Sequence, residues 1–418
     1  MATTVKFFTG FCPETIFNYN YHLQKNKRMR IVLLILLLNF SNTSFAQLRE
    51  GFDPDEARTL IAICNSYTFL NLYGSDSLII PKDYRKVFTS EVTGLDNIFQ
   101  VYESDNVGVI NFRGSTAKTS SWVENIYSAM IPSTGVIKID HKNFPYTFAA
   151  DTAAAVHSGY GLAVVLLSPK LIEQINNLNT KDIYDILITG HSQGGALAHL
   201  SRAYLENLSE GEISPKNVFK TYAFANPMCG NEEFAEEYEV NYSEINMSYT
   251  IINPSDLIPK MPMHYQEDGK IFGTLRFKNW AYGIEEINFR NIKEYTLQIF
   301  EPLLQSYINS SNRLIERLVA SFYVSIEMPE YVEDINYYQT GAIRKLEPFS
   351  NPKAPVDTLN MTKKEITKLK KDKYGNYYNK KASFFQHKPY HYYVAILKEY
   401  FSRDYKELDL LYLPENLE

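Results

Sequence analysis

The sequence predicts an α/β fold in which a mostly parallel central sheet is flanked by helices. Between about residues 100 and 255, apolar runs typical of strands alternate with patterns typical of amphipathic helices. A serine between glycines, in Gly190-His191-Ser192-Gln193-Gly194, also stands where a strand is expected to end and a helix to begin. With 418 residues, the chain is long enough for one large domain that carries an insertion.

The expected elements follow one another in chain order. A helix is expected over 53–72, because Asp53, Pro54 and Asp55 form a typical acidic helix start. Strands and helices then alternate: a strand over 107–112, a helix over 161–178, a strand and a helix across 184–208, and strands over 218–225 and 248–252. Residues 117–156 are expected to form loops.

Beyond about residue 270 this alternation is expected to stop. Residues 289–325 show a long helical pattern, which Pro302 is expected to divide. Thr362-Lys363-Lys364-Glu365 has the spacing of a capping box that opens a lysine-rich helix. Residues 363–373 hold six lysines and two acids, which indicate either a solvated face or a site for anionic lipid headgroups. We therefore expect a helical insertion at about 280–380, within a domain spanning 47–418.

The N-terminal residues have the organisation of an export signal. Four basic residues precede the apolar run 31–38, and Ser44-Phe45-Ala46 places small residues before a cleavage site after Ala46. The run is shorter than the roughly 20 apolar residues of a membrane-spanning helix. We expect residues 1–46 to be an N-terminal extension and signal peptide, with Met29 as a candidate start, and the protein to be secreted or periplasmic. A buried strand or an uncleaved anchor is the alternative.

Composition excludes some classes of function. The formal net charge of −6 argues against a nucleic-acid-binding protein, which would usually carry a basic surplus. We see no cluster of metal ligands, so neither a metal nor an organic cofactor is expected, and no stable protein partner is predicted. Cys64 and Cys229 follow the expected cleavage site and could form one disulfide or remain as two buried thiols.

The serine motif has the pattern of a nucleophile elbow. Residues 184–188 form an apolar run before it, and a helical pattern begins after it. Gly190 and Gly194 lack the Cβ atoms that would clash where strand and helix approach closely. Such a turn exposes the hydroxyl of Ser192 at the end of a sheet, beside the N–H groups of a helix N-terminus.

A serine nucleophile needs an orienting acid and a base. In α/β-hydrolase folds these follow in the chain order serine, acid, histidine. Asp256 follows the strand over 248–252, in Asn253-Pro254-Ser255-Asp256, and is the candidate acid. An ordinary turn is the competing interpretation, because these residue types all favour turns.

Three histidines follow Asp256: His264, His387 and His391. His264 comes soon after the acid, which makes it the weaker candidate. His387 falls in a loop before the last helix, whereas His391 is expected inside that helix or at its cap. We choose His387 as the base and keep His391 as the alternative.

The oxyanion of the reaction also needs hydrogen-bond donors. Ser115 follows the strand over 107–112 and could supply its backbone N–H beside that of Gln193. A plain turn at the end of the strand is the alternative.

Several segments, in the same order, resemble the class 3 lipases, which are fungal-lipase-like α/β-hydrolases. They are 109–115, 156–160, 188–196, 222–231 and 253–259, with the histidine segment near the C-terminus. The resemblance implies Ser192 as nucleophile, Asp256 as acid, and Ser115 and Gln193 as oxyanion donors. It also implies a tyrosine five residues after the histidine, which fits His387 and Tyr392.

The resemblance implies further features. His157 matches a family position that is not catalytic. A lid would come from the segment around Trp122–Ile131. This chain departs from the family in the long stretch between Asp256 and the histidine, and 131–155 is not a clear amphipathic lid.

These observations lead to the hypothesis of an exported serine hydrolase that cleaves carboxylic esters of lipids, as a triacylglycerol lipase or esterase. A lipid–water interface is one place where such a substrate would be met. A phospholipase A or a carboxylesterase for small esters is the alternative within enzymes. A non-catalytic surface binding protein on a hydrolase fold is the remote alternative.

Overall fold

The computed structural model describes residues 48–67, 79–265, 271–273, 325–334, 336–348, 356–371, 373–378 and 385–408. The described residues belong to a single unit that begins at Leu48. The expected signal peptide and residues 289–324 of the expected helical pattern lie outside them.

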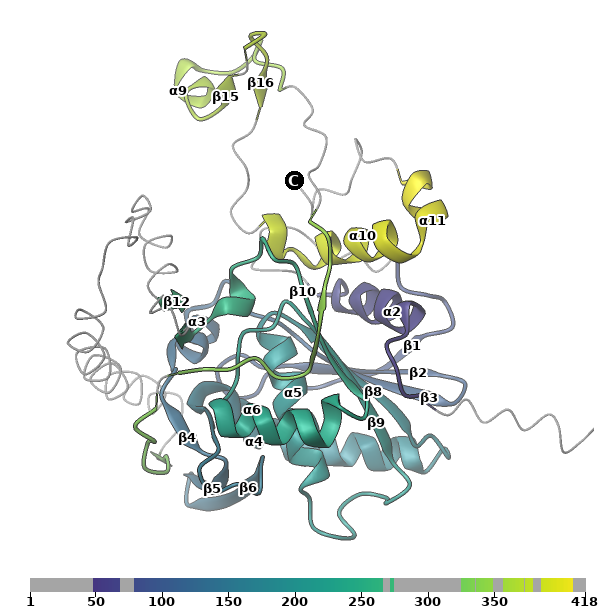
Figure 1. Ribbon diagram of the computed structural model, residues 1–418, viewed down its shortest axis with the longest axis vertical. Helices are drawn as coiled ribbons and strands as arrows, with labels where there is room; N and C mark the ends of the chain where they lie inside the picture. The colour runs from purple at the N-terminus through teal and green to yellow at the C-terminus, as the bar shows by residue number, and fades with distance from the viewer. Residues whose placement is uncertain are drawn as a thin grey trace, which may run out of the picture. The chain divides into compact units, whose positions relative to one another are not determined.

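A seven-stranded sheet organises this unit (Figure 1). Its strands, in spatial order, are β1 (Arg85–Thr89), β2 (Phe99–Ser104), β3 (Val107–Phe112), β8 (Asp185–His191), β9 (Val218–Phe224), β10 (Ser248–Ile252) and β14 (Ala342–Lys345). From β3 to β14 neighbouring strands are parallel, whereas β1 and β2 form an antiparallel edge. The mostly parallel sheet predicted from the sequence is confirmed.

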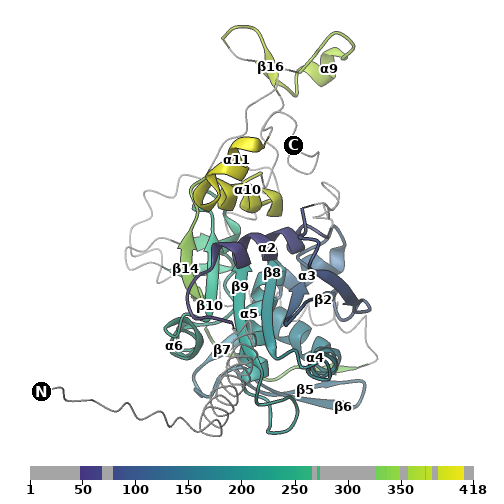
Figure 2. The ribbon, with the colours of Figure 1, turned by 90° about the vertical axis from the view of Figure 1, so that its right-hand side faces the viewer.

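Successive side chains of each strand point to opposite faces, which gives the sheet two cores. In β8, Ile186 and Ile188 belong to one apolar cluster, and Leu187 belongs to the other. Helices cover both faces, as Figures 1 and 2 show: α4 (Ser158–Asn179) and α5 (Gln193–Glu206) on one, α2 (Pro54–Cys64) and α10 (Pro389–Tyr400) on the other. Because helices cover both faces of the sheet, β8 contains a nearly continuous run of apolar residues.

Helix α2 is shorter than the predicted 53–72. The side chain of Asp53 caps its first turn by accepting hydrogen bonds from the backbone of Asp55 and Glu56, as the acidic start suggested. The helix ends at Cys64, because Asn65 closes it with hydrogen bonds from its backbone and side chain to the last turn.

The prediction of loops over 117–156 is wrong. This region contains α3 (Thr119–Ile126), β4 (Met130–Pro132), β5 (Thr134–Ile139), β6 (Lys142–Thr147) and β7 (Ala155–His157). Strands β5 and β6 pair as a hairpin whose turn residues, Asp140 and His141, both have positive φ angles. Glycine or asparagine usually marks such a turn, so Asp-His gave no recognisable signal.

The alternation of strands also continues past residue 270, which corrects the expectation that it stops there. Strand β14 lies within the predicted insertion and pairs in parallel with β10, with Ala342 opposite Tyr249. It is a short edge strand whose residues are exposed or half-buried, so it lacks the apolar run that identifies a central strand.

The lysine-rich region is mostly not helical. The capping box between Thr362 and Glu365 is confirmed, but α9 spans only Lys363–Ile366. Two short strands follow, β15 (Lys370–Lys371) and β16 (Tyr377–Tyr378), which pair antiparallel. One capped turn and a hairpin therefore replace the longer helix that was expected.

The remaining elements are small. They are α6 (Glu232–Tyr238), the π-helical η1 (Glu239–Ser243), the 3₁₀ turns η2 (Ile258–Lys260) and η4 (Phe385–His387), α11 (Ser402–Glu407), and the strands β11 (Met263–Tyr265), β12 (Ile271–Gly273) and β13 (Ile326–Glu327). Among the described helices, none combines the length and the apolar character needed to cross a membrane.

The two cysteines in the described part of the chain, Cys64 and Cys229, are buried free thiols. Cys64, the last residue of α2, belongs to the apolar cluster on one side of the sheet, and Cys229 belongs to the cluster on the other side. The alternative of one disulfide between them is therefore excluded.

Candidate active site

Ser192 occupies a sharp turn between β8 and α5. Its backbone has φ 60° and ψ −131°, a conformation that residues other than glycine rarely adopt. A Cβ atom on Gly190 would lie 2.1 Å from the carbonyl oxygen of Gly194, and one on Gly194 would lie 2.2 Å from that of Phe112. The glycines therefore permit the close approach that forces Ser192 into the strained conformation, as the elbow pattern predicted.

Three predicted side chains meet at this turn. His387 Nε2 lies 2.9 Å from Ser192 Oγ, and His387 Nδ1 lies 2.7 Å from Asp256 Oδ2. Ser192, Asp256 and His387 are 6%, 3% and 2% exposed, so little water competes for these hydrogen bonds. The structure thus brings a hydroxyl, an imidazole and a carboxylate into the order that a serine nucleophile needs.

Asp256 is held in place by further donors. The backbone N–H of Ile258 donates to Asp256 Oδ1 at 3.0 Å, and the Tyr392 hydroxyl donates to Asp256 Oδ2 at 2.8 Å. Tyr392 is fully buried in α10. The tyrosine expected five residues after the histidine therefore fixes the acid that orients that histidine.

Asn253 joins the loop of the acid to the loop of the base. Its side-chain amide donates to Gln386 Oε1 at 2.6 Å, directly before His387. Its backbone N–H donates to the hydroxyl of Tyr392 at 3.0 Å. The two loops are far apart in sequence, and these hydrogen bonds keep them next to each other.

The other histidines have different positions. His391 lies in the first turn of α10, where burial lowers its pKa to about 3, whereas His387, which contacts Ser192 and Asp256, ends the 3₁₀ turn before that helix. His157 caps α4 and stacks on Tyr160 with ring centroids 3.8 Å apart, which fits the structural role expected for it. The side chain of His264, in β11, lies outside the described part of the structure.

His191 is adjacent to the serine and packs against His387, with ring centroids 4.7 Å apart. Burial, together with the charge that His387 can carry, holds the pKa of His191 well below its ordinary value. His191 therefore stays neutral and does not oppose a positive charge on its neighbour.

Ser115 and Gln193, the expected oxyanion donors, lie beside each other. The hydroxyl of Ser115 donates to Gln193 Oε1 at 2.8 Å, and the side-chain amide of Asn125 donates to Ser115 Oγ at 2.8 Å. Ser121 Oγ also donates to Gln193 Oε1, at 3.2 Å. Helix α3, which covers part of the expected lid Trp122–Ile131, is therefore bonded to the loop of Ser115 and to the elbow.

A buried acid, Glu124, completes this network. Its carboxyl oxygens accept hydrogen bonds from the side-chain amides of Gln193 and Asn97. Burial raises the pKa of Glu124 from its ordinary 4.5 to about 8, although both amide donors act to lower it. Sequence analysis missed Glu124 and Asn97, because a single polar residue outside a recognised motif gives no distinguishing signal.

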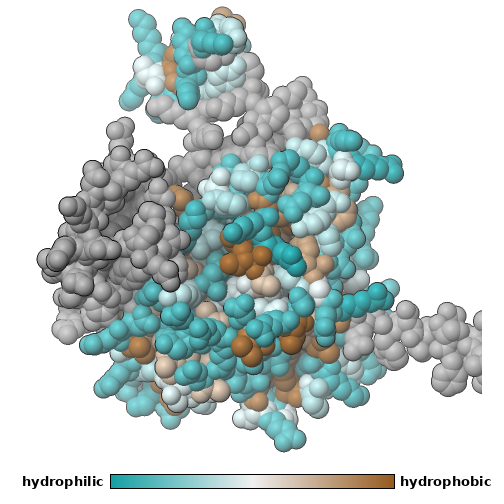
Figure 3. All heavy atoms as spheres, viewed as in Figure 1, coloured by the Kyte–Doolittle hydropathy of each residue, from teal (hydrophilic) through white to brown (hydrophobic). Residues whose placement is uncertain are grey.

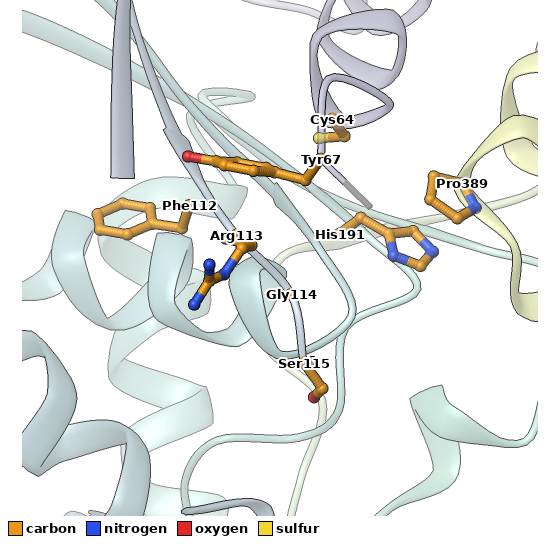
Figure 4. Close-up of a pocket in the computed structure, with 8 residues that line it drawn as sticks. All are labelled: Cys64, Tyr67, Phe112, Arg113, Gly114, Ser115, His191 and Pro389. Atoms are coloured by element: carbon orange, nitrogen blue, oxygen red, sulfur yellow. The ribbon is translucent and has the colours of Figure 1, made fainter. Parts of the chain in front are cut away.

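A small pocket lies beside Ser115 and the elbow (Figure 4). Most of its lining is apolar or aromatic, and in Figure 4 Tyr67, Cys64 and Pro389 lie on the side away from Ser115. Arg113 and Phe112 belong to the end of β3 and the loop after it. The pocket therefore lies beside one expected oxyanion donor, Ser115, and beside His191, which precedes the candidate nucleophile.

Metal chemistry has no evident site among the described residues. They contain no group of three or more histidine, cysteine, aspartate or glutamate side chains placed to hold a metal ion.

Comparison with known families agrees with this geometry. The sequence model of the family described as lipase (class 3) matches residues 109–266, from β3 through the serine and the acid. The match covers less than half of the chain. The match and the mostly parallel sheet support the α/β-hydrolase fold predicted from the sequence.

Two curated relatives are similar over part of their length. A triacylglycerol lipase, OBL1, of Nicotiana tabacum is 25% identical over 177 residues, which are 42% of this chain and 30% of that protein. The secreted mono- and diacylglycerol lipase LIP2 of Malassezia restricta is 24% identical over 203 residues, 46% of this chain and 59% of that protein. This chain therefore spans less than two thirds of each of them.

Among solved structures, the Rhizomucor miehei triacylglyceride lipase is similar, with 20% identity and a TM-score of 0.38. The match covers 51% of this chain and 77% of that one.

The buried carboxyl of Glu124 predicts a stability that depends on pH. Its pKa is higher in the folded than in the unfolded chain, so the folded state binds the proton more tightly. The free energy of unfolding should therefore fall as the pH rises from 4.5 to about 8 and then level off. Each pKa unit corresponds to about 1.4 kcal/mol.

Urea unfolding of the wild type and of Glu124→Gln across this range checks the prediction. The variant should show a clearly smaller decline with pH than the wild type. Glu210→Gln, at an exposed carboxyl, is the matched control and should keep the wild-type slope. An unchanged slope in Glu124→Gln would refute this role of Glu124.

Proposed function

We propose that this chain is an exported serine hydrolase that cleaves carboxylic esters of lipids, with acylglycerols as the principal substrate class. The observation that carries the proposal is the pair of hydrogen bonds that His387 makes with Ser192 and with Asp256. The match of residues 109–266 to the class 3 lipase family model supports the same chemistry.

In the proposed reaction, Ser192 Oγ attacks the ester carbonyl carbon while His387 Nε2 takes the hydroxyl proton. The tetrahedral intermediate collapses, the bond to the alcohol breaks, and His387 returns the proton to that alcohol. Water then attacks the acyl-enzyme with His387 again as base, which releases the carboxylic acid and restores the serine. Asp256 orients the imidazole and stabilises its positive charge in both halves.

The backbone N–H groups of Ser115 and Gln193 are the proposed donors to the oxyanion. Gln193 is the first residue of α5, so its N–H lies at the positive end of a helix dipole. The side-chain bonds among Ser115, Gln193 and Asn125 support this assignment, because they limit the movement of both backbone segments. Donors fixed in advance need no reorganisation when the negative charge develops.

The names of the curated relatives support the proposed substrate class. The curated relatives are named as lipases of triacylglycerol or of mono- and diacylglycerol.

Export is part of the proposal. Residues 1–46 are proposed as an N-terminal extension and signal peptide, with 47–418 as the mature hydrolase domain and its insertion at about 280–380. The relative from Malassezia restricta is named as secreted, which supports an extracellular location.

The nucleophile is tested with Ser192→Ala. This variant should lose hydrolysis of p-nitrophenyl butyrate by at least about 10³-fold, because no other group in the site can form the acyl-enzyme. A fluorophosphonate should form a phosphonyl–serine bond with the wild type, with loss of fluoride, and leave Ser192→Ala unlabelled. Retained turnover in this variant would end the proposal, and a wild type without adduct or turnover would favour a binding protein.

The base is tested by comparing His387→Gln with His391→Gln. The first change should lower kcat by at least about 10³-fold, because the serine loses the group that accepts its proton. The second removes a buried imidazole one turn further along the chain and should leave kcat within about threefold in the folded protein. The opposite ranking would identify His391 as the base.

Tyr392 is proposed as a positioning residue that acts through Asp256. Tyr392→Phe removes one donor to the carboxylate and should lower kcat about tenfold, with little change in KM. Tyr390→Phe, the same substitution on the same helix, is the control and should keep wild-type kcat. An unchanged kcat in Tyr392→Phe would show that the remaining bonds suffice to hold Asp256.

A phospholipase A activity is the second candidate, and the lysines of 363–373 favour testing it. Release of fatty acid from triacylglycerol and from phosphatidylglycerol, measured side by side, separates the two activities.

A further inference from the structure

We propose that residues 356–378, called the basic hairpin below, dock on the surface of an anionic phospholipid membrane. The inference deepens the proposed function, because it names the surface at which the ester hydrolase would meet its substrate. The inference rests on the proposed function only where it says that the membrane supplies the ester substrate. Docking itself can be measured without any catalysis.

The basic hairpin has a defined local framework. The capping box at Thr362 starts the single turn of α9, and the short strands β15 and β16 pair antiparallel after it. The backbone N–H of Val356 donates to the carbonyl of Tyr377 at 2.7 Å, which joins the start of the segment to its end. The described side chains are therefore presented by a folded element.

This element buries none of its described residues. One helical turn and a two-stranded hairpin are too small to form a core of their own. Leu359 is 87% exposed and Tyr374 is 77% exposed, and Met361, Ile366 and Leu369 are only half-buried. A group of apolar side chains that the chain leaves near water indicates an external surface that can cover it.

Positive charge accompanies these apolar side chains. Six lysines of the hairpin are exposed: Lys363, Lys364, Lys368, Lys370, Lys371 and Lys373. Asp357, Glu365 and Asp372 lie in the same segment, so the lysines outnumber the acids and the segment keeps a positive charge. The carboxylate of Glu365 accepts hydrogen bonds from the backbone and hydroxyl of Thr362. Over α9, β15 and β16, Figure 3 shows mainly hydrophilic atoms with apolar ones between them. The chain as a whole has a net charge of −6, so this lysine cluster is a positive region of a chain that is negative overall.

The chemistry of the cluster favours a lipid surface. Lysine side chains beside exposed leucine and tyrosine combine attraction to anionic headgroups with apolar groups that enter the interface. Lys371 and Lys373 lie over the rings of Tyr377 and Tyr374, at 5.1 and 4.8 Å, which keeps cations and aromatic rings together. The segment contains no arginine, the residue that suits fixed, bidentate recognition of phosphate. Mobile point charges fit a fluid array of headgroups better than a single bound phosphate.

The test uses the full chain with Ser192→Ala, so that vesicle lipids are not consumed. Sedimentation with vesicles of equal parts phosphatidylcholine and phosphatidylglycerol should bring down the protein, whereas vesicles of phosphatidylcholine alone should leave it in solution. Raising the ionic strength should release it, because salt screens exposed charges. Equal binding to both kinds of vesicle, or to neither, would overturn the proposal.

Two matched variants assign the binding to the hairpin. Replacing Lys363, Lys364, Lys370 and Lys371 by glutamine should weaken partition into anionic vesicles at least about tenfold. Replacing four exposed lysines elsewhere should change it less than about twofold, although the net charge changes equally. The control set is Lys82, Lys86, Lys142 and Lys216. Equal losses in both sets would show a general charge effect and refute the assignment.

Two further measurements separate the remaining outcomes. In the chain that keeps Ser192, the hairpin variant should hydrolyse p-nitrophenyl butyrate at the parent rate, since the changed lysines lie outside the catalytic machinery. Absence of hydrolysis in the parent itself would end the proposed function and leave the docking result standing. Binding to single-stranded DNA as tight as binding to anionic vesicles would overturn the choice of lipid.

Discussion

The strained backbone of Ser192 is the constraint on which the rest of the site depends. A residue with a side chain stays in this conformation only where its surroundings allow no other. Here β8 pairs on both sides within the sheet, α5 packs closely behind the turn, and two glycines permit the contact. The packed sheet and helix thus keep Ser192 in a backbone conformation that it would not retain in a free loop. This fixed backbone conformation also fixes the direction of the Ser192 hydroxyl.

A second feature is the dense polar bonding around that hydroxyl. On one side Tyr392, Asn253 and Gln386 hold the acid and the base, and on the other Asn125 and Glu124 hold Ser115 and Gln193. These groups are largely removed from water, so each unsatisfied partner would be costly. Such a network tolerates few alternative arrangements, which makes the site a preorganised one.

The sequence predicted those parts of the molecule whose signal is local. The strand, turn and helix around Ser192 have a distinct pattern, and the chain order of hydrolases pointed to Asp256 and His387. The hairpin of β5 and β6 was not predicted, because Asp140 and His141 occupy turn positions where glycine or asparagine is usual. Strand β14 and Glu124 depend on partners distant in sequence, β10 for the one and Gln193 for the other. Single-sequence periodicity carries no information about such partners.

Strand β14 has a consequence for how the chain can close the site. Asp256 and His387 are 131 residues apart, and the entropy of closing so long a loop opposes their contact. By pairing with β10, β14 anchors the chain partway and divides this span into two shorter loops. Because the closure cost grows only logarithmically, at about 0.6 kcal/mol for each doubling of length, either loop can be lengthened at little thermodynamic cost. The segment between the acid and the base can therefore change in length without changing the geometry of Asp256 and His387.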